Sequence, residues 1–187
     1  MHLLKVYYEY VNHPARALEM LFKERSINAA LLGYLTATFG WVLFFNIGSG
    51  LTAFAFLFKL TVLFIAELTA GYFLAAFCGL FLDLSKIKTS PAELFILIGS
   101  AGFIKALLIA FALISASVPY IKLGYLAPLA LLLVLGLQLG YLTRGIMRAY
   151  QIPVGKALTA WVVAFVPALI ALGLLGVFLI WGIVLLF

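Results

Sequence analysis

Residues 56–73 read FLFKLTVLFIAELTAGYF, a nearly continuous apolar run that nevertheless contains two charged side chains, Lys59 and Glu67. Charged side chains are rare where water is excluded, so the first question is which solvent this run meets. The whole chain has 187 residues, of which 67% are hydrophobic and 10% are charged, whereas soluble domains are about 45–50% apolar and about 25% charged. We therefore expect an integral membrane protein.

Five apolar runs are long enough to cross a bilayer, since a helix spans the hydrocarbon core in about 20 residues. The residues before them include a proline-led amphipathic segment, which we expect to lie on the membrane surface as a short helix. The sequence thus predicts an all-α, polytopic membrane helix bundle, with an N-terminal interfacial segment at residues 1–25 and a five-span transmembrane domain at residues 26–187. The expected spans are residues 26–46, 51–82, 91–118, 128–150 and 156–187.

The second and fifth runs are longer than one crossing requires. A helix of about 32 residues reaches about 48 Å, against about 30 Å of hydrocarbon, so we expect these helices to protrude, kink or break. Gly71 and Pro167 are the candidate kink positions. The start of the third run is predicted by Ser90 as the N-cap, Pro91 in the first turn and Glu93 completing a capping box.

Most of the basic residues fall on one side of a five-span arrangement. The positive-inside rule then places the N-terminus in the cytoplasm and the C-terminus outside. The formal net charge of +6 favours contact with membrane lipids that carry anionic headgroups on the cytoplasmic face, rather than with nucleic acid. Part of this charge forms an expected cytoplasmic basic rim, which comprises Lys86, Lys88, Arg144, Arg148 and Lys156.

The depth of each charge in the bilayer predicts a partner for Glu67. At about 1.5 Å per residue, Glu67 lies about 24 Å above the inner end of the second span, and Lys105 lies about 21 Å above the inner end of the third. A short loop joins these spans, so we expect them to be antiparallel neighbours. We therefore predict that Glu67 contacts Lys105, while Lys59 extends to the outer headgroups. The three residues form a candidate intramembrane polar site, which either binds an ion, proton or lipid headgroup or clasps two helices in register.

No catalytic or metal-binding pattern is recognisable in the sequence. His2 and His13 have no partners at ligand spacing. We find no paired-carboxylate arrangement, phosphate-binding loop or serine-hydrolase motif. We therefore expect a protein that is not an enzyme and that uses no cofactor and no metal.

Small residues recur at helix-packing spacing in three of the spans. Such stripes let two helix backbones approach closely, either within one chain or between the chains of a homo-oligomer. The candidate packing residues are Gly136 and Gly140 in the fourth span, Gly71, Ala75 and Gly79 in the second, and Ala160, Ala164 and Ala168 in the fifth.

Three stretches of the chain resemble the Yip1 family in its short prokaryotic form. They are NHPARALEMLFKERSINAALLGYL, a surface helix running into the first span; SPAELFILIGSAGFIKALLIAFAL, a capped third span; and LLLVLGLQLGYLTRGIMRAYQIPVGKALTAWVVAF, a basic turn between the fourth and fifth spans. The resemblance implies a five-span protein of a prokaryotic cell membrane, with a cytoplasmic N-terminus and no catalytic activity. It assigns no role to any single residue.

Eukaryotic members of that family are associated with Rab-type GTPases and vesicle traffic, largely through a longer cytosolic N-terminal region. Here about 25 residues precede the first span. We find no counterpart of the aspartate–leucine–tyrosine–glycine–proline-like motif of the eukaryotic branch. The resemblance therefore does not extend to a GTPase partner.

Two hypotheses for the function follow. The first, which the resemblance implies, is a non-enzymatic membrane protein that organises the bilayer or partner proteins. The second is a small transporter or lipid-translocating protein that uses Glu67 and Lys105 in a polar cavity. The two differ in whether these side chains meet in a dry contact or line a water-filled groove.

We predict that the loops at residues 46–50 and 83–90 lie on opposite sides of the membrane. Single cysteines placed at Ser49 and Ser85 in a Cys78→Ala background should differ in reactivity. An impermeant maleimide added to intact cells should label only the position at Ser49. Labelling of both positions from the same side would contradict the five-span arrangement.

Overall fold

The computed structural model describes residues 26–47, 49–50, 52–117 and 123–186. The interfacial helix predicted within residues 1–25 lies outside these ranges. Every regular element in the described part of the chain is helical, which confirms the all-α prediction. The elements are α3 (Ile27–Phe45), α4 (Ala53–Leu84), α5 (Pro91–Ala101), the 3-10 helix η1 (Gly102–Lys105), α6 (Ala106–Ser117), the 3-10 helix η2 (Leu123–Leu126), α7 (Ala127–Tyr150) and α8 (Val154–Leu186).

Five helical stretches in these ranges are long and apolar enough to cross a membrane, one for each predicted run. The third of them is assembled from α5, η1 and α6, so its α-helical hydrogen bonding changes to 3-10 in the middle of the span. The predicted third span is thus confirmed as one helical stretch, built from three segments. The five stretches are Ile27–Phe45, Ala53–Leu84, Pro91–Ser117, Ala127–Tyr150 and Val154–Val177.

Polar residues begin α3, α4 and α5, although not always as predicted. The Ser26 hydroxyl accepts a bond from the backbone N–H of Ala29 at 3.4 Å and caps α3. Thr52 caps α4 in the same way. Ser90 occupies the N-cap position of α5 and Pro91 opens the helix, but the Ser90 side chain makes no capping bond. The predicted capping bond from Ser90 is therefore wrong, although the start of the helix is right.

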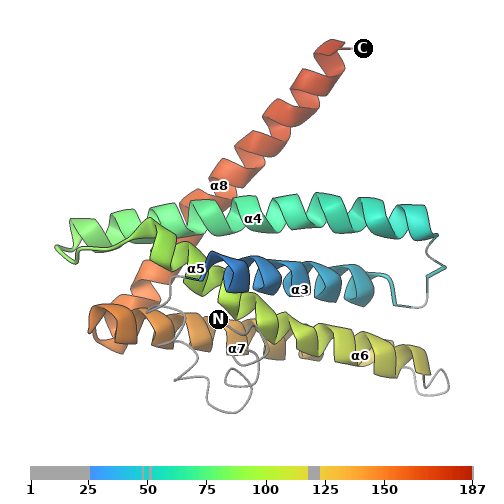
Figure 1. Ribbon diagram of the computed structural model, residues 1–187, viewed down its shortest axis with the longest axis horizontal. Helices are drawn as coiled ribbons and strands as arrows, with labels where there is room; N and C mark the ends of the chain where they lie inside the picture. Colours follow the sequence, from blue (N-terminus) through green and yellow to red (C-terminus); the bar gives the residue numbers. More distant parts are fainter. Residues whose placement is uncertain (1–25, 48, 51, 118–122, 187) are drawn as a thin grey trace.

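The helices pack around α3, which contacts α4, α5, η1 and α6 (Figure 1). The junction of α4 with α5 and the junction of α7 with α8 lie at the same end of the molecule, on the left in Figure 1. Ile87 from the first junction and Ile152 from the second pack on the same hydrophobic cluster. The basic residues of these two segments therefore lie at the same end of the bundle.

Within the described residues, α8 is not one of the helices that pack closely on α3. It packs chiefly on α4, crosses that helix steeply and projects beyond the bundle (Figure 1). The excess length of the fifth run thus protrudes, and α8 continues through Pro167 without a break. α4 is likewise one continuous helix of 32 residues. Gly71 does not interrupt it, so neither of the two candidate kink positions ends or divides its helix.

The second-span glycines lie in packed interfaces, whereas those of the fourth span do not. A Cβ atom at Gly71 would meet the hydroxyl of Tyr34, and one at Gly79 would lie 3.4 Å from the Thr89 hydroxyl. Ala75 is buried. A Cβ atom at Gly136 or Gly140 would have no neighbour within 4 Å. Of the two alternatives for Gly136 and Gly140, packing within the described chain is thus not observed, and packing between the chains of a homo-oligomer stays a prediction.

The tightest backbone packing joins α3 to the third span. A Cβ atom at Gly33 would meet the carbonyl oxygen of Gly99, and one at Gly102 would meet the carbonyl oxygen of Gly33. About two turns after Gly33 in α3, a Cβ atom at Gly40 would lie 2.5 Å from the carbonyl oxygen of Lys105. Glycine lets the two backbones approach this closely, as it does in other membrane helix pairs. The approach holds η1 against α3 and so positions Lys105.

We predict that Gly33→Ala destabilises the protein, because the new methyl group would meet backbone atoms that cannot move aside without displacing a helix. The loss should be about 1–3 kcal/mol, as for other overpacked interiors. Thermal unfolding in detergent measures it. The matched control is Gly136→Ala, whose methyl group enters open space. Equal behaviour of the two variants would contradict the tight contact between α3 and the third span.

Candidate functional site

Glu67 and Lys105 meet inside the bundle, as their similar depths in the bilayer predict. The Lys105 ammonium lies 2.6 Å from Oε1 of Glu67, close enough for an ion pair with a hydrogen bond. The exposed fraction of the side chain is 7% for Lys105 and 19% for Glu67. The predicted contact is confirmed.

Trp41 of α3 completes this group. Its indole N–H donates a hydrogen bond of 2.5 Å to the same Oε1 of Glu67. The Lys105 ammonium also lies 4.9 Å from the centroid of the Trp41 ring, within the range of a cation–π interaction. We refer to Trp41, Glu67 and Lys105 as the clasp. One carboxylate oxygen thus accepts two bonds from two other spans.

The local structure around Lys105 explains why its side chain reaches Glu67. Lys105 is the last residue of η1, and 3-10 geometry advances about 120° per residue rather than about 100°. The change from α-helix to 3-10 helix therefore alters the face of the third span on which the following side chains lie. Close contact with Gly40 holds this segment against α3. Since Trp41 follows Gly40 in sequence, the same contact brings the indole and the ammonium together.

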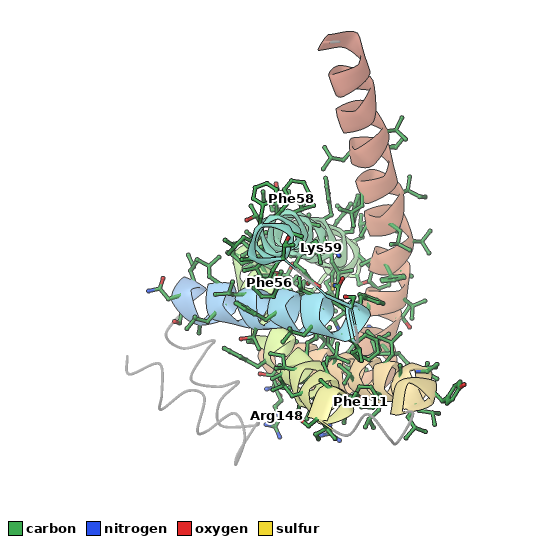
Figure 2. The ribbon with its side chains drawn as sticks, turned by 90° about the vertical axis from the view of Figure 1, so that its right-hand side faces the viewer. Phe56, Phe58, Lys59, Phe111 and Arg148 are labelled. Atoms are coloured by element: carbon green, nitrogen blue, oxygen red, sulfur yellow. The ribbon has the colours of Figure 1, made fainter. Side chains whose placement is uncertain are left out.

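Lys59 is separate from the clasp. Its ammonium donates a hydrogen bond of 2.6 Å to Oδ1 of Asn46, the C-cap residue of α3. Lys59 precedes Glu67 by two helical turns, or about 12 Å of rise along α4. It is exposed near the α3–α4 junction, where Figure 2 labels it. The expectation that Lys59 is not the partner of Glu67 is confirmed, and its contact with outer headgroups stays a prediction.

The basic rim is exposed and lies apart from the clasp. Lys86 and Lys88 follow α4, while Arg144 and Arg148 lie near the end of α7 and Lys156 near the start of α8. All five side chains are exposed. Lys86 has a φ of 63°, a left-handed conformation that lets the chain turn sharply between α4 and α5.

The clasp pairs one carboxylate with one ammonium and one indole N–H. Among the described residues, no group of three or more His, Cys, Asp or Glu side chains is placed to hold a metal ion. The carboxylate and the ammonium neutralise each other, and the indole supplies a second donor. Such a group can bind three helices together at membrane depth, since an unpaired charge there is costly.

Trp41 is the functional-site residue that sequence reasoning missed. The depth of Trp41 could have been estimated from its place in the first span, but the side of α3 that faces α4 could not. One sequence signal does mark the face of α3 that packs on its neighbours. It is the stripe of small residues Ala30, Gly33, Ala37 and Gly40. Trp41 lies at the edge of that face.

Comparisons with known proteins give no relative for this chain: no family model matches it, and no curated protein or solved structure is significantly similar to it. The fold and the clasp are therefore the features of the molecule that bear on its function.

We predict that the clasp residues are energetically coupled. Glu67→Gln or Lys105→Met alone leaves a charge unpaired at membrane depth, which costs about 2.5–3.5 kcal/mol on insertion scales. Each single variant should therefore lower the unfolding temperature in detergent, and the double variant should recover part of the loss. Trp41→Phe should cost less, because the ion pair remains.

The control for this double-mutant cycle is Lys59→Met, which removes a charge from the same helix as Glu67 but from an exposed position. It should change the unfolding temperature little. Additive losses in Glu67→Gln and Lys105→Met would show that the two side chains do not depend on each other, contrary to the prediction.

Proposed function

We propose that the protein is a non-enzymatic multi-pass membrane protein that organises the bilayer or partner proteins, similar to the Yip1 family. In this proposal it resides in a prokaryotic cell membrane, with the N-terminus in the cytoplasm and the C-terminus outside. The observation that carries the proposal is that Oε1 of Glu67 accepts bonds from both Lys105 and Trp41, which links three spans. The deepest charges of the described chain are used to hold helices together, which suits a scaffold.

A transporter makes a different demand on the same residues. A substrate ion or proton must reach the charged group, and the group must exchange its partner for the substrate. Lys105 is almost fully buried, and its ammonium and the Trp41 indole both bond to one oxygen of Glu67. Two described surface cavities, one at the α3–α4 junction and one between α7 and α8, are lined by other residues. Both points favour a structural role for the clasp.

One observation favours the second candidate, a small transporter or lipid-translocating protein. The Glu67 side chain keeps 19% of its exposure, so part of it faces the exterior of the bundle. A carboxylate at this depth that is not sealed on every side is the kind of group that a lipid headgroup or a proton could approach. The two candidates therefore predict different behaviour of Glu67 in a reconstituted membrane.

The test uses the purified protein in liposomes of defined composition. Proton entry is followed with a trapped pH-sensitive dye, and lipid translocation with fluorescent phospholipids quenched from outside. The scaffold proposal predicts rates equal to those of protein-free vesicles, together with a change in vesicle diameter that grows with protein density. A flux that disappears in Glu67→Gln and persists in the Lys59→Gln control would overturn the proposal in favour of transport.

A further inference from the structure

A groove of about 460 Å³ lies between α7 and α8. Gly136 and Gly140 form part of its lining, Leu139 and Leu158 are among its apolar walls, and Arg144 lies toward the basic end of the bundle. A Cβ atom at either glycine would have no neighbour within 4 Å. The bare backbone of α7 is thus exposed along the groove, and no described helix fills it.

The face of α7 that lines the groove continues beyond it to Arg148, toward the basic end. Gly136, Gly140, Arg144 and Arg148 follow one another at intervals of four residues, and residues spaced in this way share a helix face. Arg144 and Arg148 are both exposed, and Figure 2 shows Arg148 at the outer edge of the molecule. The face is therefore apolar and open at membrane depth and positively charged where α7 ends.

The charges at this end are not balanced by the described residues. Five exposed cations form the basic rim, whereas the acidic residues of the two junctions are Asp83, which bonds to Thr89, and Glu93. Arg144 and Arg148 are like charges at i and i+4, a spacing at which they repel each other. An anion placed between the guanidinium groups would remove that repulsion and accept charge-assisted hydrogen bonds.

We propose that this groove binds an anionic phospholipid, with its phosphate at Arg144 and Arg148 and one acyl chain along Gly136 and Gly140. The order of the groove, apolar inside the membrane and cationic at its edge, is the order of a phospholipid in the leaflet on that side. Free phosphate would bind the two arginines and would leave the groove along Gly136 and Gly140 empty. A second copy of the chain that packed here through its own α7 face would add two more guanidinium groups and would supply no anion to neutralise them. The inference is independent of the proposed function.

The test is native mass spectrometry of the protein in detergent, titrated with phosphatidylglycerol or with zwitterionic phosphatidylcholine. The unaltered protein should bind phosphatidylglycerol more tightly. Arg144→Gln should weaken phosphatidylglycerol binding about tenfold, the effect of losing one charge-assisted contact, and should leave phosphatidylcholine binding nearly unchanged. Gly140→Leu fills this part of the groove and should weaken the binding of both lipids.

Matched controls separate this site from general charge and general bulk. Lys88→Gln removes an exposed cation of the same rim that does not line the groove. Gly173→Leu adds the same bulk as Gly140→Leu at another exposed glycine with open space around it. Both controls should bind phosphatidylglycerol as the unaltered protein does.

Three results would overturn the inference. The first is equal affinity of the unaltered protein for the two lipids. The second is that the acyl chain plays no part in binding. This would be shown if Gly140→Leu left lipid binding intact, or if inorganic phosphate displaced the lipid as effectively as phosphatidylglycerol does. The third is a dimer that Gly140→Leu converts to a monomer, which would assign the groove to a second copy of the chain.

Discussion

The bundle is organised around the need to neutralise one carboxylate at membrane depth. Glu67 cannot remain unpaired in hydrocarbon without a penalty of about 2.5–3.5 kcal/mol, and its two donors come from two other spans. Satisfying it requires α3, α4 and the third span to meet at one level. The glycines of α3 and the third span make that meeting physically feasible, because they let η1 approach Gly40 until Lys105 and Trp41 flank the same oxygen.

The same constraint gives the 3-10 segment a structural role. Intrachain backbone hydrogen bonds must be retained in a bilayer, and 3-10 geometry retains them while changing the direction of the side chains. A change from α-helix to 3-10 helix at Gly102–Lys105 thus alters the facing of Lys105 without leaving a break in the span. The lysine therefore faces the bundle interior, where its side chain is 7% exposed, rather than lipid.

Depth and rotation differ in how well they can be predicted from this sequence. The contact of Glu67 with Lys105 was predictable, because rise per residue and loop length determine depth and neighbours in a membrane. The rotation of each helix about its own axis, which decides the neighbour that a side chain faces, was not predictable. The spacing of Gly136 and Gly140 suggested a packed face, yet in the described chain they face an open groove. Trp41 was missed for the same reason, since neither its depth nor its residue type indicates which helix its ring faces.

The crossing of α8 over α4 has a consequence for biosynthesis. Ala160 and Ala164 of α8 are buried in the same hydrophobic cluster as Ala75 and Cys78 of α4. α4 is synthesised long before α8, so during translation this face of the second span lacks the cover that α8 later provides. It must meet lipid or an insertion chaperone until the fifth span arrives. Completion of the core is therefore a late event, and substitutions that enlarge Ala160 or Ala164 should impair maturation of the nascent chain more than insertion of the earlier spans.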